Sequence, residues 1–400
     1  MPTKLDPKDP YYIDFPRRIA DIQAEMAKQK IDVYLGSRLR TLSWTLDAFC
    51  PWRSFVVIPA VGLPTVFTFV IDAARVADDT WVDEDHVRGF APMGGQDQIE
   101  QIADFIRDLL KNGRGRLGIE SGMSNYLPEG WLTHYEYEQY RASLPDAELV
   151  NAHGIVDRLA IIKDKGTINR FREASRIVDI GHRAVLEALK NGGWKGMTET
   201  EIAGLAAYAM RKAGSEWEWS FTGGNEIACG YRTGLAGGAC TPATRKKLAE
   251  GEPLMVDIHA MFKLGLGDHS HNYFIGGATK RQRWHADNFL DLVSATLKAY
   301  RAGITPSRLA EEMMARGLVA YVTCLDPRKI PAEMAGRVFD RDFLDQIGPD
   351  VDPCAERGEF HTCVTAGPMF QHPIVVEAGE TVHRDGFVFA DLKLKRNGAP

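Results

Sequence analysis

The segment from Leu254 to Gly276 constrains the fold more than any other part of the sequence. Two short apolar runs flank a stretch that contains two glycines, and this arrangement predicts a β-hairpin. A tight turn near Phe262–Lys263 would place Asp257 directly opposite Asp268. Opposed residues on antiparallel strands have Cβ atoms about 5 Å apart, so the two carboxylates would face each other.

Facing carboxylates repel one another unless one is protonated or a cation lies between them. His259 follows Asp257 by two residues and leaves the same face of the strand, and His269 and His271 follow the second aspartate. Carboxylate and imidazole together suit zinc, manganese or iron, whereas calcium prefers oxygen ligands alone. The hairpin is therefore a candidate metal or acid–base site. The alternative is that the aspartates cap turns and the histidines are solvated.

Length and composition describe a globular protein that is long enough for two domains. The 400 residues are 44% hydrophobic and 26% charged, and the formal net charge is −6. This charge gives no electrostatic reason to expect nucleic acid or an anionic membrane as a partner. The apolar runs are shorter than the roughly 18 residues that cross a bilayer. Six cysteines are scattered without a C-x-x-C pair, which indicates free thiols and a cytoplasmic protein.

Alternating strand and helix patterns predict an α/β domain in the first part of the chain. The predicted strands are 31–35, 54–58, 65–70 and 115–120, and the predicted amphipathic helices are 15–30 and 98–110. Such alternation favours a mostly parallel or mixed sheet that is covered by helices. Helices then dominate, with segments predicted at 167–189, 198–213 and 282–301 and another that starts at Thr305.

This order of elements resembles the pita-bread metallohydrolases, the family of prolidase, aminopeptidase P and creatinase. Asp257-Ile-His259 and Asp268-His-Ser270-His271-Asn-Tyr-Phe-Ile-Gly276 are similar to the family's first metal hairpin. Three earlier segments, 160–174, 221–226 and 247–257, are similar to its interdomain helix and to the stretches before its first histidine and first aspartate. The resemblance implies a creatinase-like α/β N-terminal domain at 1–155, an α+β pita-bread catalytic domain at 156–400, and a homodimer.

The C-terminal part departs from the family pattern. Tyr231-Arg232-Thr233 stands where the family has its first histidine, and the family's Gly-His-Gly-Ile-Gly motif is missing. His361 and His372 are the nearest candidates for proton transfer, since imidazole titrates near neutral pH. Residues 376–382 resemble the segment that leads to the first glutamate, and 386–398 resemble the last strand, with an apolar residue at the last glutamate's place.

The resemblance implies hydrolysis of an amide or peptide C–N bond in a small substrate, such as an Xaa-Pro dipeptide, by a divalent ion (Mn, Zn, Fe or Co). The expected ligands are Asp257, Asp268, His259, His271 and His361, with His361 or His372 transferring the proton. Arg232 could hold a substrate carboxylate, and Trp219 could line the pocket. The alternatives are a metal-independent amidinohydrolase of the creatinase kind, a lyase on the same fold, and a ligand-binding homologue with impaired catalysis.

Overall fold

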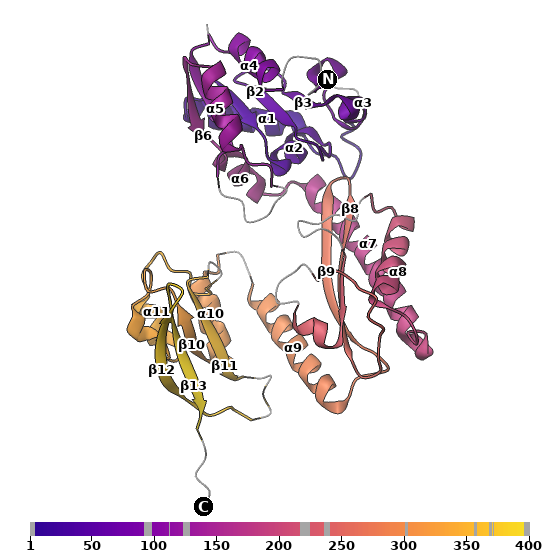
Figure 1. Ribbon diagram of the computed structural model, residues 1–400, viewed down its shortest axis with the longest axis vertical. Coiled ribbons are helices and arrows are strands. Elements are labelled where there is room, and N and C mark those ends of the chain that lie inside the picture. Colours follow the sequence, from indigo (N-terminus) through magenta and orange to yellow (C-terminus); the bar gives the residue numbers. More distant parts are fainter. Residues whose placement is uncertain are drawn as a thin grey trace, which may run out of the picture. The chain divides into compact units, whose positions relative to one another are not determined.

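The computed structural model describes residues 5–91, 98–111, 113–122, 129–216, 225–235, 241–300, 303–355, 358–367, 370 and 372–395. The chain divides into two compact units, Met1–Gly277 and Ala278–Pro400 (Figure 1). The domain boundary predicted between residues 155 and 156 falls within helix α6 (Gly154–Ile161) of the first unit and stays a prediction. None of the described helices combines the length and apolar character that a membrane span requires.

A six-stranded mixed sheet begins the first unit and confirms the predicted strands. Its order is β4-β3-β2-β1-β5-β6, with β1 (Val33–Gly36), β2 (Phe55–Pro59), β3 (Thr65–Phe69), β4 (Val87–Phe90), β5 (Gly115–Ile119) and β6 (Ala147–Asn151). The β1–β2 and β2–β3 pairs are antiparallel, and the other neighbours are parallel. The helices of this part are α1 (Phe15–Lys28), α2 (Leu39–Leu46), α3 (Val70–Asp79), α4 (Gln98–Leu109), α5 (His134–Ser143) and α6.

This sheet separates two hydrophobic cores, because successive side chains of a strand point to opposite faces. On one face Leu35 packs in a cluster with Ile102 of α4. On the other face Tyr34 and Ile58 pack in a cluster with Ile19 of α1. Both faces are buried, which explains why these strands read as nearly continuous apolar runs in the sequence.

The second part of the first unit contains two helices and a three-stranded antiparallel sheet. It contains α7 (Lys165–Leu189), α8 (Glu199–Lys212), β7 (Glu226–Cys229), β8 (Pro253–Phe262) and β9 (Gly265–Phe274), in the strand order β7-β8-β9. Figure 1 shows α7 and α8 on one side of the long β8–β9 hairpin. The predicted start of α8 is confirmed, since Thr198 and Glu201 form a capping box.

Glycines let the hairpin approach α7 closely. A Cβ atom at Gly267 would lie 2.6 Å from the backbone carbon of Ala174, and one at Gly265 would lie 2.8 Å from Cβ of Arg170. Both distances are too short for carbon atoms in van der Waals contact. The two glycines that suggested a turn in the sequence therefore serve packing, and the helix is held directly against one face of the hairpin.

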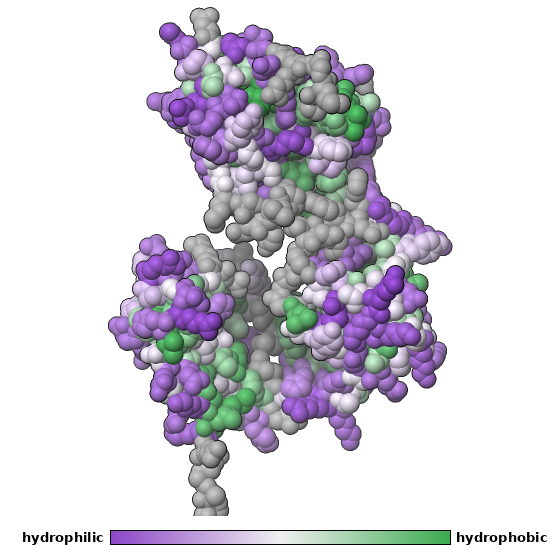
Figure 2. All heavy atoms as spheres, viewed as in Figure 1, coloured by the Kyte–Doolittle hydropathy of each residue, from purple (hydrophilic) through white to green (hydrophobic). Residues whose placement is uncertain are grey.

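The second unit has a four-stranded antiparallel sheet in the order β11-β10-β13-β12. Its elements are α9 (Lys280–Ala299), α10 (Pro306–Ala315), β10 (Val319–Leu325), α11 (Arg341–Gln346), β11 (Phe360–Ala366), β12 (Val376–Arg384) and β13 (Phe387–Leu394). Val322, Phe343, Phe360 and Val388 belong to its core. Figure 2 shows a hydrophobic area on this unit among mainly hydrophilic residues, and β12 and β13 expose Val382 and Phe389.

Candidate metal centre

The turn between β8 and β9 sets the register of the site. Lys263 and Leu264 form the turn with φ angles of 45° and 61°. Positive φ at both central residues is typical of the type I′ turn, whose twist matches that of the flanking strands. This turn lies one residue further along the chain than predicted, so Asp257 pairs with Ser270 and His259 with Asp268.

The predicted pairing of Asp257 with Asp268 is therefore wrong by two positions. A shift of two positions preserves the face from which each side chain leaves, because strand side chains alternate with a period of two. Asp257, His259 and Asp268 consequently share one face of the hairpin. The predicted cluster survives, with His259 and not Asp257 directly opposite Asp268.

The three side chains converge. The Nε2 atom of His259 lies 3.3 Å from Oδ1 of Asp268 and 3.7 Å from Oδ1 of Asp257. One ligand atom from each residue lies within 4.8 Å of the other two. His259 is 5% exposed, whereas the Asp268 side chain is 70% exposed. The site thus runs from the interior at β8 to the surface at β9.

The electrostatic environment of Asp257 is unfavourable to its charged form. Burial raises the pKa of the Asp257 carboxyl group, and the negative charges of Asp268 and Glu226 act in the same direction, against the opposing effect of His259. Within the described part of the chain, Oδ1 of Asp257 and Nδ1 of His259 are buried without a hydrogen-bond partner. Buried polar atoms of this kind are rare in folded proteins and require an explanation such as a bound ion.

Glu226 is a member of this environment that the sequence analysis did not single out. It is the first residue of β7, is 4% exposed, and pairs directly with Asp257 across the β7–β8 ladder. The backbone N–H of Thr241 donates to its Oε2 at 3.5 Å, while its Oε1 is buried without a partner among the described residues. The signal in the sequence was an acid in the short apolar run Glu-Ile-Ala-Cys, a context in which a carboxylate is unusual.

This donor set fits a divalent transition-metal ion. Zinc binds nitrogen and oxygen ligands at about 2.1 Å, so two ligands of a tetrahedral ion lie roughly 3.4 Å apart. The distances of 3.3 and 3.7 Å from His259 to the two aspartates are close to that separation. The combination of carboxylate and imidazole is also common to manganese, iron and cobalt sites.

His271 lies on the opposite face of the hairpin. It pairs with Val256, and its ring stacks on that of His182 from α7 with a centroid distance of 3.9 Å. His182 is itself buried, and its ring nitrogens contact the hydroxyl of Tyr273 and the carbonyl oxygen of His269. The structure therefore does not bring His271 to Asp257 and His259, because neighbouring residues of a strand point to opposite sides.

The remaining predicted site residues lie elsewhere in the chain. His361 is an exposed residue of β11 that pairs with Cys324, and His372 is exposed between β11 and β12. Both belong to the second unit, and their catalytic and metal-binding roles stay predictions. Trp219 lies outside the described residues.

Arg232 has partners within the fold. It lies in a short 3₁₀ helix (Gly230–Gly234) after β7, where its Nε atom donates to the buried carboxylate of Glu199 and its Nη2 atom donates to the carbonyl oxygen of Pro242 at 2.7 Å. Glu199 also accepts hydrogen bonds from the backbone N–H groups of Cys229 and Thr244. Burial alone would raise the pKa of Glu199, but the hydrogen bonds from Thr244 and Cys229 outweigh it and lower the pKa. A substrate-binding role for Arg232 stays a prediction.

Comparison with known families divides the chain into three matched segments. Residues 18–162 match the creatinase/prolidase N-terminal domain, and residues 169–324 match metallopeptidase family M24. Residues 305–396, which lie in the second unit, match the diphthamide synthase C-terminal domain. The last match includes 376–396, so it does not support the interpretation of 376–398 as the final strands of the pita-bread family.

The individual relatives include proteins named as a peptidase and a hydrolase. The uncharacterized peptidase YqhT of Bacillus subtilis is 28% identical over 194 residues, 48% of this chain and 49% of the relative. Ectoine hydrolase of Halomonas elongata is 24% identical over 47% of this chain and 48% of its own. The chain thus spans about half the length of the curated relatives it matches.

Solved structures show the same fold. An Xaa-Pro dipeptidase from Bacillus anthracis superposes with a TM-score of 0.59 at 19% identity, covering 76% of this chain and 78% of that chain. The prolidase from Pyrococcus horikoshii gives a TM-score of 0.59 at 18% identity, covering 76% and 82%. A creatinase-type N-terminal domain followed by an M24 domain is the arrangement that the sequence predicted. Residues 18–162 and 169–324 thus match the two domains of the pita-bread metallopeptidases of family M24, and this match ends at residue 324.

Proposed function

We propose that the protein is a divalent-metal-dependent hydrolase that cleaves a C–N bond in a small amide or dipeptide, in the manner of an Xaa-Pro peptidase. The observation that carries this proposal is the grouping of Asp257, His259 and Asp268 on one face of the β8–β9 hairpin. The M24 match over 169–324 supports it, as do relatives named as an ectoine hydrolase and an Xaa-Pro dipeptidase.

Residues of the hairpin would have different roles at such a metal site. A divalent ion polarises a substrate carbonyl and lowers the pKa of a coordinated water. Asp257 and Asp268 contribute the negative charge that retains the cation. The backbone N–H of His259 donates to Oδ1 of Asn225 at 3.0 Å, which fixes β8 at the position from which the imidazole projects. The exposed Asp268 lies at the side from which a substrate would enter.

Several features of the proposal come from the family resemblance. The ion is Mn, Zn, Fe or Co, the protein is a cytoplasmic homodimer, and His361 or His372 transfers the proton to the leaving amine. Arg232 and Trp219 are the proposed substrate contacts.

The test uses the full chain, freed of metal by a chelator and reloaded with Mn²⁺, Co²⁺ or Zn²⁺. Hydrolysis is measured on Xaa-Pro dipeptides, creatine-like amides and betaine-like amides. We expect activity to require one of the ions and to be abolished in Asp257→Asn, because the ligand set loses a buried charge. Asp146→Asn changes an exposed aspartate before β6 and serves as the matched control, with activity equal to that of the wild type.

Activity that persists without metal and survives Asp257→Asn would instead favour the metal-independent creatinase-like mechanism. If the protein bound none of the ions and hydrolysed none of the substrates, the proposed function would be rejected.

A further inference from the structure

The position of Glu226 gives it access to the same centre. Directly paired residues of neighbouring antiparallel strands leave the same face, with Cβ atoms about 5 Å apart. Glu226 pairs with Asp257 across β7 and β8, and His259 pairs with Asp268 across β8 and β9. All four side chains therefore leave one face of the three-stranded sheet, and the two on β8 lie between the other two.

The lengths of the three acidic side chains match this arrangement. Adjacent strands lie about 4.8 Å apart, so a residue on β7 must reach across one strand spacing to meet ligands centred on β8. The acid on β7 is a glutamate, which has one methylene group more than the aspartates on β8 and β9. The longer side chain thus stands on the strand that lies on the far side of β8 from Asp268.

Two carboxylate oxygens on this face are buried without a hydrogen-bond partner among the described residues. One is Oε1 of Glu226, a residue that is only 4% exposed. The other is Oδ1 of Asp257, which pairs with Glu226 across β7 and β8. Buried charges in proteins are paired or coordinate metals, because an isolated one is strongly disfavoured. The carboxylates of Glu226 and Asp257, beside the imidazole of His259, are therefore suited to hold a cation.

We infer that Glu226 is the fourth protein ligand of the metal ion, so that β7, β8 and β9 together carry a complete site for one ion within the first unit. This inference rests on the proposed function. The four ligands are Glu226, Asp257, His259 and Asp268. Three carboxylates and one imidazole favour borderline or hard divalent ions, such as Mn²⁺, Fe²⁺, Co²⁺ or Zn²⁺, over soft ions such as Cu⁺. Retention of the ion then does not depend on His361.

A structural role for Glu226 makes a different prediction. The carboxylate accepts a hydrogen bond from the backbone of Thr241, and a glutamine has an oxygen that can accept the same bond. Glu226→Gln therefore preserves the size and the hydrogen bond and removes the negative charge. If Glu226 only held β7 in place, this variant would bind metal as the wild type does.

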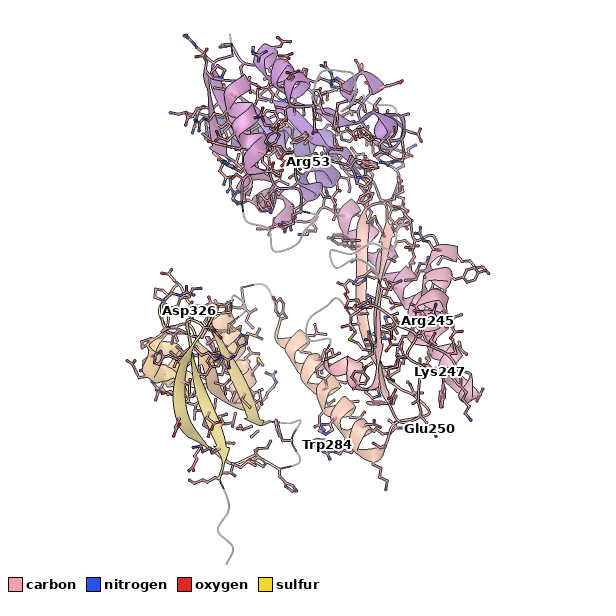
Figure 3. All side chains as sticks on the ribbon, in the orientation of Figure 1. Arg53, Arg245, Lys247, Glu250, Trp284 and Asp326 are labelled. Carbon is pink, nitrogen blue, oxygen red and sulfur yellow. The ribbon has the colours of Figure 1, made fainter. Side chains whose placement is uncertain are left out.

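The experiment is a Co²⁺ titration of the metal-free full chain, followed by visible absorption and by equilibrium dialysis. We expect one ion per chain in the wild type. Glu226→Gln should weaken binding by on the order of a hundredfold and change the absorption spectrum, since loss of even an outer-shell partner weakens metal sites by about 10- to 100-fold. Glu250→Gln, in the exposed loop that leads into β8 (Figure 3), and His361→Ala should bind as the wild type does. Circular dichroism of each metal-free variant confirms that it is folded.

The outcomes separate this inference from the proposed function. If the wild type binds Co²⁺, Asp257→Asn does not and Glu226→Gln binds with wild-type affinity, the fourth ligand is not Glu226 and the proposed function stands. If His361→Ala lost as much Co²⁺ affinity as Glu226→Gln, the inference that the site does not depend on the second unit would be wrong. Absence of binding in the wild type would overturn both proposals.

Discussion

Two groups of buried carboxylates in the first unit are built in opposite ways. Glu120, at the end of β5, is fully buried and accepts hydrogen bonds from Tyr34, Ser37, Arg38 and Thr41 at distances of 2.5 to 2.8 Å. Its charge is matched by the Arg38 guanidinium at 2.8 Å. Glu226 and Asp257 are also largely removed from solvent, but each has an oxygen without a partner among the described residues.

The difference distinguishes a carboxylate that stabilises the fold from carboxylates that are available to bind a ligand. A satisfied buried charge fixes the elements around it, and here Glu120 ties β1 and the start of α2 to the end of β5. A buried carboxylate without hydrogen-bond partners lowers the free energy of unfolding and is retained where function requires it. Glu199 resembles Glu120, since Arg232 and two backbone N–H groups satisfy it. The contrast can be tested by removing the cations of the satisfied group.

The largest expected effect follows removal of the cation beside Glu120. Arg38→Ala leaves a fully buried carboxylate without its ion pair, which typically costs about 3–5 kcal/mol of unfolding free energy. Urea unfolding of the metal-free protein measures the loss. Arg40→Ala removes an exposed neighbour that pairs with Asp157 and should change stability by less than about 0.5 kcal/mol. Equal losses in the two variants would show that Glu120 does not need its cation.

A smaller effect is expected at Glu199. Arg232→Ala removes one of several partners of this carboxylate, and a buried acceptor that loses a partner costs about 1–3 kcal/mol. Co²⁺ affinity should not change, because Arg232 contacts none of the four acid or imidazole ligands in the described structure. The same titration distinguishes this structural role from a role at the metal site. A loss of metal binding without a loss of stability would contradict it.

The smallest expected effect concerns pH and the opposite face of the hairpin. Burial lowers the pKa of His182 to about 4, and the neighbouring rings of His271 and His269 act in the same direction, while Asp179 and the carbonyl of His269 oppose them. The unfolded chain takes up the proton near pH 6.5 and the folded chain only near pH 4. Stability from this group is therefore complete above pH 6.5 and is lost as the pH falls towards 4.

Unfolding of His182→Gln should accordingly depend less on pH between 6.5 and 4 than unfolding of the wild type. Urea midpoints at three pH values in this window measure the slope. His285→Gln changes an exposed histidine of α9 and should keep the wild-type slope. An unchanged slope in His182→Gln would assign the acid sensitivity to other groups of the protein.

Much of the fold could be predicted because its signals are local. The strands of the first sheet are apolar runs, and α8 is marked by its capping box. The register of the hairpin could not be read in the same way. Its turn consists of Lys263 and Leu264, whereas type I′ turns are usually marked by asparagine, aspartate or glycine.

The candidate site was predictable where it depends on one hairpin and not beyond. Asp257 and His259 alternate on one strand, and the predicted turn brings Asp268 to the same face, because its register error of two positions preserves the face of each side chain. Glu226 joins them through pairing with a strand that begins more than twenty residues later, and this pairing leaves no local pattern. The M24 match ends at residue 324, and His361 and His372 lie in a segment that matches another domain, so their roles stay predictions.

The two-residue turn determines which side chains of β9 face the acidic site and which pack against α7. Residues of even number on β9, such as Asp268, lie on the acidic side, and the odd-numbered His269 and His271 lie against α7. Deletion of Lys263 or Leu264 alone would exchange the two sets, which would push an aspartate towards the helix layer and rotate imidazoles towards the acids. A change of one residue in this connection would therefore have to be absorbed by a β-bulge, so neither side of the ribbon can evolve without regard to the other.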